Sequence, residues 1–147
     1  MIRRALPVTV LLLTVAGCGS GAGASSPADS VRSYNSAVAD GDGSGACGQL
    51  DASARKELQL STQGAIRGSC NQVIETLAAF YDEATKDRLR KAKVESKPHG
   101  DRATATFTSP VAFGGPDRKQ TYELRKVDGN WKIASLGIGA HDGPVGP

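Results

Sequence analysis

The apolar residues in the first half of the chain recur every three or four positions, which is the period of a helix with one buried face. Ser26, Pro27 and Asp29 predict a helix start, because serine caps, proline suits the first turn and an acidic residue favours the positive end of the helix dipole. The apolar stripe of this helix consists of Val31, Tyr34, Ala37 and Val38. Gly41-Asp42-Gly43 is expected to end the helix.

Two shorter helical stretches and one long helix are predicted next. One stretch covers residues 46–50, and a second, capped by Asp51, reaches Leu58. Residues 60–68 are polar and punctuated by glycine, so we expect a loop there. The longest helix begins at Ser69 or two residues later. Its buried side is expected to hold Val73, Ile74, Leu77, Phe80, Tyr81 and Ala84.

After Leu89 the pattern changes from helical spacing to alternation, which predicts β-strands. Residues 93–96 begin the first strand, and residues 97–101 have the composition of a turn. In residues 102–108, two alanines and Phe107 alternate with threonines. This alternation predicts a strand with one buried and one solvated face.

The remaining segments predict a closing hairpin. Residues 109–118 contain two prolines and two glycines and are expected to form a connection. Residues 121–127 and 130–136 are predicted strands, and Asp128-Gly129 between them is a tight-turn signal. The region beyond Gly137 is predicted to be a loose tail. Helices followed by antiparallel strands indicate an α+β domain, with the N-terminal helices packed on one face of a curved sheet.

The first eighteen residues have a different character. Arg3 and Arg4 precede an apolar run over residues 5–15, which is shorter than the roughly 20 residues of a membrane span. Pro7 would weaken a continuous helix there. A short apolar segment between basic and small residues is typical of a processed signal. The order, ending in Val15-Ala16-Gly17-Cys18, resembles a bacterial lipoprotein signal peptide with its lipobox.

The lipoprotein resemblance implies that diacylglycerol is attached to the Cys18 thiol and that cleavage occurs just before this residue. Residues 1–17 would then be the signal peptide, 18–27 a flexible tether, 28–138 the folded domain and 139–147 a disordered tail. The expected location is the extracytoplasmic face of the cell membrane, with the membrane as a partner through the lipid anchor. The alternative is ordinary secretion with cleavage elsewhere.

Charge changes the picture once the signal is removed. The chain of 147 residues has 18 basic and 15 acidic residues, and the signal carries two of the basic ones. The mature protein is therefore nearly neutral. No basic stripe interleaved with aromatic residues is present, so nucleic acid is not an expected partner. The basic cluster at residues 86–93 is interpreted as a solvated helix end in preference to a contact with anionic lipid.

Cysteine usage fits an oxidising compartment. Of three cysteines the lipobox uses Cys18, and Cys47 and Cys70 remain. A disulfide between them is favoured over two separate buried thiols, and it would stabilise the fold by roughly 3 kcal/mol. His99 and His141 lie far from this pair in the sequence, so no metal site and no cofactor are expected.

Three places in the chain carry a second resemblance. The first is YNSAVADGD at residues 34–42, followed by Ala46-Cys47; the second is the pair Cys47 and Cys70 around the middle helices. The third is the hairpin YELRKVDGNWKI at residues 122–133. Their order is similar to the NTF2-like superfamily, in particular to its small actinobacterial lipoproteins, and covers residues 28–138. The resemblance implies a cone, in which a long helix crosses a bent sheet and an open end leads to a pocket.

Enzymes of that superfamily include steroid isomerases and dehydratases with acid and base groups in the cone. Tyr34 lies where the isomerases place a hydrogen-bonding tyrosine. Their general base follows the second helix, and residues 60–68 contain no carboxylate. Proton transfer needs a base within hydrogen-bond reach of the substrate. We therefore assign no catalytic residue, and interpret Tyr34 as core.

The leading hypothesis is a non-enzymatic lipoprotein whose cone binds a small apolar ligand or a partner protein. Its pocket candidates are Tyr34, Phe80, Tyr81, Phe107 and Trp131. A second hypothesis is an interaction module that docks in a cell-envelope complex through its sheet face, which predicts an exposed apolar patch there. A third is an enzyme of the isomerase or dehydratase type, which predicts a buried carboxylate or histidine within reach of Tyr34.

Overall fold

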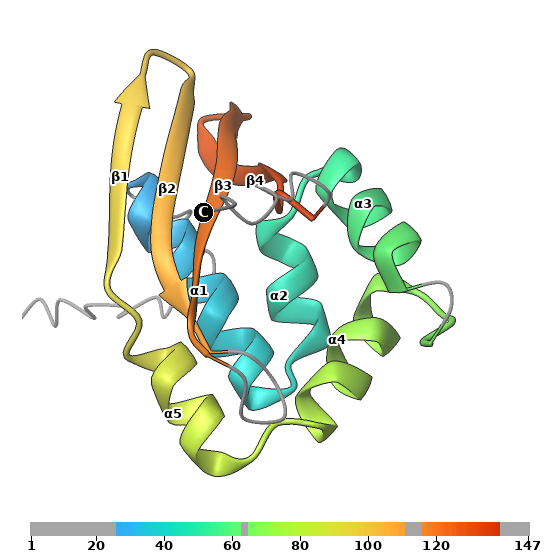
Figure 1. The fold of residues 1–147 in the computed structure, drawn as a ribbon. Coiled ribbons are helices and arrows are strands. Elements are labelled where there is room, and N and C mark those ends of the chain that lie inside the picture. The colour runs from blue at the N-terminus through green and yellow to red at the C-terminus, as the bar shows by residue number, and fades with distance from the viewer. Residues whose placement is uncertain (1–25, 63–64, 111–115, 139–147) are drawn as a thin grey trace, which may run out of the picture.

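The computed structural model describes residues 26–62, 65–110 and 116–138. Five helices precede four strands in this part of the chain (Figure 1). The fold class is therefore α+β, as the pattern predicts. The expected signal peptide, Cys18, the tether up to residue 25, His141 and the tail from residue 139 lie outside the described residues.

The first helix begins and ends where its capping residues predict. The helices are α1 (Pro27–Asp40), α2 (Gly43–Gln49), α3 (Ala52–Thr62), α4 (Cys70–Ala79) and α5 (Glu83–Arg90). The Ser26 side chain accepts a hydrogen bond from the Asp29 amide at the start of α1. Gly41 ends the helix in the left-handed conformation, with φ of 70°. A side chain at this φ would be strained, which is why glycine suits this position.

The long helix predicted from Ser69 onward is wrong. The chain leaves α4 at Phe80, and the Asp82 side chain accepts a hydrogen bond of 2.7 Å from the Thr85 amide to cap α5. This interruption changes which side chains face the core. Phe80 is 55 % exposed and Ala84 is exposed, whereas Thr85 is buried.

Two other boundaries differ from the predicted ones. Helix α3 continues through Thr62, so the loop predicted to begin at residue 60 begins later. The first strand extends to His99 through residues predicted to be a turn, and the turn itself is only Gly100 and Asp101. Pro98 is tolerated in this strand because the strand lies at the edge of the sheet.

The strands form one antiparallel sheet in the order β1-β2-β3-β4. Their bounds are β1 (Val94–His99), β2 (Arg102–Ser109), β3 (Arg118–Val127) and β4 (Asn130–Ser135). The predicted hairpin between β3 and β4 is confirmed: Asp128 and Gly129 both have positive φ, at 51° and 80°. Such a turn matches the twist of the two strands that it joins.

Helix α1 lies across one face of the sheet (Figure 1). Helices α2, α3 and α4 lie to one side of α1. Helix α1 contacts β1, β2 and β4, while α3 packs against β4. The inner face of the sheet alternates buried with exposed positions, as predicted for residues 102–108. Its buried side chains are Val94, Ala103, Ala105, Phe107, Tyr122, Leu124, Trp131 and Ile133.

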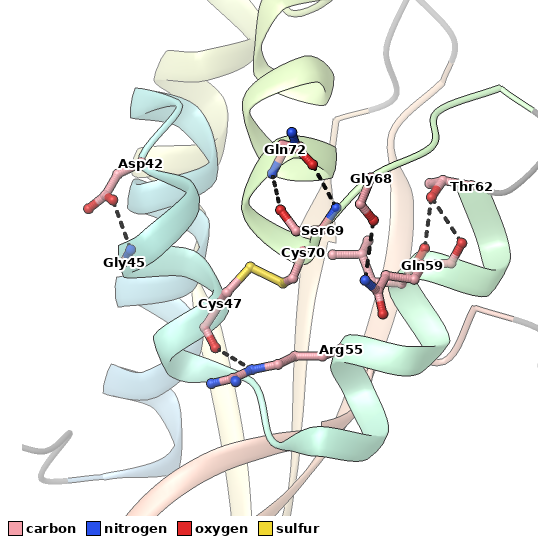
Figure 2. Close-up of a disulfide and its surroundings, with 11 residues drawn as sticks. Asp42, Gly45, Cys47, Arg55, Gln59, Thr62, Gly68, Ser69, Cys70 and Gln72 are labelled. Atoms are coloured by element: carbon pink, nitrogen blue, oxygen red, sulfur yellow. Dashed lines mark hydrogen bonds between the residues drawn. A yellow bond between two sulfur atoms is a disulfide. The ribbon is translucent and has the colours of Figure 1, made fainter.

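The expected disulfide joins Cys47 on α2 to Cys70 on α4, with 6.1 Å between the Cα atoms (Figure 2). Its surroundings fix both helices. Arg55 donates from Nε to the Cys47 carbonyl at 2.9 Å. Ser69 and Gln72 form a reciprocal capping box at the start of α4. The link therefore ties two helices whose ends are already defined by local hydrogen bonds.

Candidate functional site

The structure divides the five aromatic candidates by burial. Tyr34, Phe107 and Trp131 are buried, at 6 %, 3 % and 6 % exposure. Tyr81 is partly buried and packs against the core. Phe80 lies mainly at the surface. Four of the five candidates therefore contribute to the interior or its margin, and Phe80 does not.

Tyr34 and Phe107 meet at a third ring that the sequence analysis did not single out. Tyr122 on β3 lies with its ring centroid 6.0 Å from that of Tyr34 and 5.0 Å from that of Phe107. Both pairs are edge-to-face, the arrangement that aromatic quadrupoles favour. The position of Tyr122 in an alternating strand would have identified it as buried, but no local pattern shows that it meets α1.

The tyrosine hydroxyls of this cluster are polar groups in a mainly apolar interior, which also holds Ser30, Asn35, Asp51 and Thr85. Burial raises the pKa of Tyr34 far above its ordinary value, and the charges of Tyr81 and Glu57 add to the effect. The pKa of Tyr122 is raised mainly by burial, then by Tyr34, Tyr81 and Glu57. Burial likewise raises the pKa of Tyr81. All three side chains therefore remain neutral hydrogen-bond donors at physiological pH.

Neither the Tyr34 nor the Tyr122 hydroxyl forms a hydrogen bond with a protein group in the described part of the chain. Both residues are nevertheless more than nine-tenths buried. The fully enclosed side-chain atoms of the described residues without a hydrogen-bond partner are Asn35 Nδ2 and Asp51 Oδ2, and Asp51 Oδ2 forms an ion pair with Arg125. The two hydroxyls are not among them.

Glu57 on α3 is the carboxylate whose charge reaches this cluster. Its two oxygens accept hydrogen bonds from the backbone amides of Leu136, at 2.9 Å, and Ile138, at 2.7 Å. The side chain thus holds the segment that follows β4 against α3. No local pattern in the sequence identifies Glu57, because its partners lie 79 and 81 residues away.

Trp131 does not join the tyrosine cluster. It pairs with Lys126 in the hairpin, and Lys126 is four residues from Tyr122 along β3, which is about 13 Å of strand. Lys126 Nζ lies 5.2 Å from the centroid of the Trp131 ring. The Trp131 carbonyl accepts a hydrogen bond of 3.1 Å from Ser30 Oγ in the first turn of α1. Trp131 therefore packs the hairpin onto the start of α1.

Hollows on the surface lie away from the aromatic candidates. One hollow of about 350 Å³ on the sheet is lined by residues that include His99, Arg102, Thr104, Glu123 and Arg125. Another, of about 540 Å³, is lined by residues that include Lys56, Glu57, Leu60 and Ile138. None of the five candidates lines either of these two hollows.

Among residues 26–62, 65–110 and 116–138, no group of three or more histidine, cysteine, aspartate or glutamate side chains could hold a metal ion. No helix in these ranges is both long enough and apolar enough to cross a bilayer. Comparisons of the chain with protein-family models, with curated proteins and with solved structures find no match.

Proposed function

We propose that this protein is an extracytoplasmic lipoprotein, anchored through Cys18, whose domain is an NTF2-like cone that binds a small, largely apolar ligand without catalysing a reaction. The observation that carries the proposal is the pair of buried tyrosines, Tyr34 and Tyr122, whose hydroxyls have no protein partner in the described residues. The placement of α1 across the antiparallel sheet supports the cone (Figure 1).

The cluster has the composition of a site for an apolar molecule with one polar group. The rings of Tyr34, Tyr122 and Phe107 supply apolar surface in edge-to-face contact. A hydroxyl in a low-dielectric interior forms a stronger hydrogen bond than one in water. A ligand with a carbonyl or hydroxyl oxygen would therefore be oriented by the tyrosines and held by the surrounding apolar surface.

The enzyme hypothesis needs a general base near Tyr34, and Glu57 is the candidate among the described residues. Glu57 is the carboxylate that acts on Tyr34 electrostatically, and both of its oxygens already accept backbone hydrogen bonds. Each oxygen keeps a further lone pair, but the two amides fix the orientation of the carboxylate. Glu57 is better suited to holding the end of β4 than to proton transfer.

The sheet-face hypothesis predicts an apolar patch, and the described outer face of the sheet is polar. Most of its exposed side chains are charged residues and threonines, and Thr106 and Thr121 approach each other at 3.3 Å between Oγ1 atoms. The large exposed apolar side chains of the described residues are Leu60, Phe80, Val127 and Ile138. None of them lies in the middle of this face, so ligand binding is the better-supported function.

The test is ligand retention. We expect the full chain, purified from its native membrane and extracted with organic solvent, to release a small molecule that mass spectrometry detects in stoichiometric amount. Tyr34→Phe, which removes one hydroxyl, should reduce the retained amount about tenfold, because a buried hydrogen bond to a ligand contributes roughly 1.5 kcal/mol. Thr106→Val, which removes a hydroxyl on the outer face, is the control and should retain the wild-type amount.

Retention of nothing by the wild-type chain, or equal retention by Tyr34→Phe, would overturn the ligand assignment. The anchor is tested separately by the intact mass of the protein from the same membranes. We expect the mass of a chain beginning at Cys18 with attached lipid, and Cys18→Ser should lack both processing and lipid. A wild-type chain of unlipidated mass would overturn the anchor and leave the ligand result standing.

A further inference from the structure

Four basic side chains form a row across all four strands of the sheet. In the strand register His99 on β1 pairs with Arg102 on β2, Arg102 pairs with Arg125 on β3, and Arg125 pairs with Lys132 on β4. These residues alternate with the buried inner-face positions, so they share the outer face. We call these four residues the basic row. Lys97, two residues before His99, adds a further exposed cation on the same face.

The basic row is electrostatically unfavourable within the protein. Like charges directly opposite each other on neighbouring strands destabilise a sheet. Two members are held toward the β4 edge: Arg125 Nε lies 2.6 Å from Asp51 Oδ2, and Lys132 Nζ donates to the Gly48 carbonyl at 2.5 Å. Arg102 forms no ion pair with the described residues, although Glu123 lines the same hollow. An anion bound over the row would relieve this repulsion.

The basic cluster at residues 86–93 differs from the row, because four of its five cations are paired. Lys86 contacts Glu83, Arg88 contacts Asp117, Arg90 contacts Asp40 and Lys91 contacts Asp87, all at 2.6–2.9 Å. The densest basic segment of the sequence is thus largely neutralised in the fold. In the basic row Arg102 has no ion pair with the described residues, and neither has the neighbouring Lys97.

The row lies at the end of the sheet where the tether enters the domain. His99 and Arg102 flank the β1–β2 turn, and Lys132 follows Trp131, whose carbonyl binds Ser30 in the first turn of α1. Residues 18–26 would reach at most about 30 Å when fully extended. A lipid on Cys18 would therefore keep this end of the domain close to the membrane surface.

We propose that the basic row, together with Lys97, docks on the anionic phospholipid headgroups of the membrane that holds the protein. The charge of the row is complementary to such a surface, and the tether places it within reach. The hollow beside Arg102 and Thr104 offers a phosphate both a guanidinium and a hydroxyl donor. The inference rests on the proposed anchor for its location, and its chemistry does not require the anchor.

The test uses the full chain carrying Cys18→Ser, so that no lipid anchor contributes. Partition onto phosphatidylglycerol-containing vesicles and onto phosphatidylcholine vesicles is measured by co-sedimentation at low and high salt. We expect Lys97→Gln/Arg102→Gln to weaken partition onto the anionic vesicles roughly 25-fold, since each cation near such a surface contributes about a fivefold effect. Binding to phosphatidylcholine vesicles should not change. Residues 1–17 are the same in every variant, so any contribution that they make to vesicle binding cancels when variants are compared.

Arg118→Gln/Lys119→Gln is the matched control. It removes the same two charges from the start of β3, about 23 Å along the strand from Arg125, and should weaken partition far less. Quenching of Trp131, the sole tryptophan of the chain, by headgroup spin-labelled lipid reports which end faces the bilayer. We expect quenching in the wild type and in the control, and its loss in Lys97→Gln/Arg102→Gln.

Equal losses of partition onto anionic vesicles in the two double variants would show a non-specific charge effect. That result would overturn the proposal that the basic row is the docking surface. Strong binding of free inorganic phosphate in solution, without any preference for anionic vesicles, would overturn it in favour of a soluble anion. Failure of the proposed lipid anchor would be seen only in the intact mass of the wild-type protein, which would then lack the lipid on Cys18. The two proposals are therefore distinguishable.

Discussion

Arg125 on β3 places its Nε 2.6 Å from Oδ2 of Asp51, a carboxylate whose side chain is only 4 % exposed. The other oxygen of Asp51 accepts a hydrogen bond of 2.9 Å from the Ala54 amide at the start of α3. The Asp51 backbone amide donates to the Ile133 carbonyl, also at 2.9 Å. One residue therefore joins the start of α3 to two strands of the sheet.

Asp51→Asn and Asp51→Ala should separate these roles. Asparagine still caps a helix but cannot neutralise Arg125, so we expect a loss of about 1 kcal/mol, because the half-exposed guanidinium rehydrates. Alanine removes the cap as well, and the expected loss is about 2 kcal/mol. Urea unfolding measures both. Asp42→Ala, which removes an exposed cap of α2, is the control at about 1 kcal/mol. Wild-type stability of Asp51→Ala would contradict the assigned role.

Gly43→Ala should destabilise the fold through a steric conflict. A Cβ at Gly43 would lie 2.5 Å from the Asn71 carbonyl oxygen, which belongs to the backbone of α4 and cannot move freely. We expect a loss of about 1–3 kcal/mol, as in other overpacked positions. Gly48→Ala in the same helix meets no atom within 4 Å and should gain about 0.5 kcal/mol. Equal thermal midpoints for the two variants would disprove the close approach of α2 to α4.

Removal of the disulfide should cost about 3 kcal/mol. The two cysteines are 23 residues apart, and closing a loop of that size restricts the unfolded chain by roughly this free energy. The variant Cys47→Ser/Cys70→Ser should match the reduced wild type in urea unfolding. Addition of reductant should not change the free energy of unfolding of the double variant. A reductant effect on that variant would indicate that another thiol contributes.

The buried tyrosines should make the protein sensitive to alkali. Folding raises the pKa of Tyr34 and Tyr122 above the ordinary value of 10.0, so the folded state holds these protons more tightly than the unfolded state. Their contribution to stability is complete below pH of about 10 and is lost as the pH rises through the folded pKa. Tyr34→Phe should flatten the decline. Urea midpoints measured at increasing pH test this, and an unchanged slope in Tyr34→Phe would contradict it.

Asn35 presents a buried amide that is unsatisfied in the described residues. The residue is 2 % exposed, and its Nδ2 has no hydrogen-bond partner. Asn35→Leu removes the stranded donor and should stabilise the fold by about 1 kcal/mol. Asn35→Asp buries an unpaired charge and should destabilise it by several kcal/mol. Destabilisation by leucine in chemical unfolding would contradict this prediction.

Local signals predicted much of the fold. The Ser26 cap and Gly41 stop define α1, and Asp128-Gly129 defines the last hairpin, because each acts within four residues of itself. The disulfide was also predicted, since two cysteines remained once the lipobox was assigned. Phe80 shows the limit of this reasoning. An apolar residue at helical spacing was interpreted as buried, but the cap formed by Asp82 competes with helix continuation and prevails.

The candidate site depended on contacts that no local pattern contains. Tyr34 and Phe107 belong to the one set of pocket candidates predicted from the sequence, and their common neighbour Tyr122 does not. Glu57 binds amides some 80 residues away. Strand alternation predicts which side chains are buried, but only packing determines which of the buried ones meet.

The sequence by itself determined the class of the fold, the positions of most elements, the cysteine pair and the expectation of a lipid anchor at Cys18, because these follow from short-range propensity and composition. Tertiary structure decided where charge and polarity accumulate. It paired Arg88 and Arg90 with acids from other elements. It left His99 and Arg102 of the basic row exposed and without an ion pair in the described residues. Strand register sets that outcome, since it places residues 99, 102, 125 and 132 side by side across the sheet.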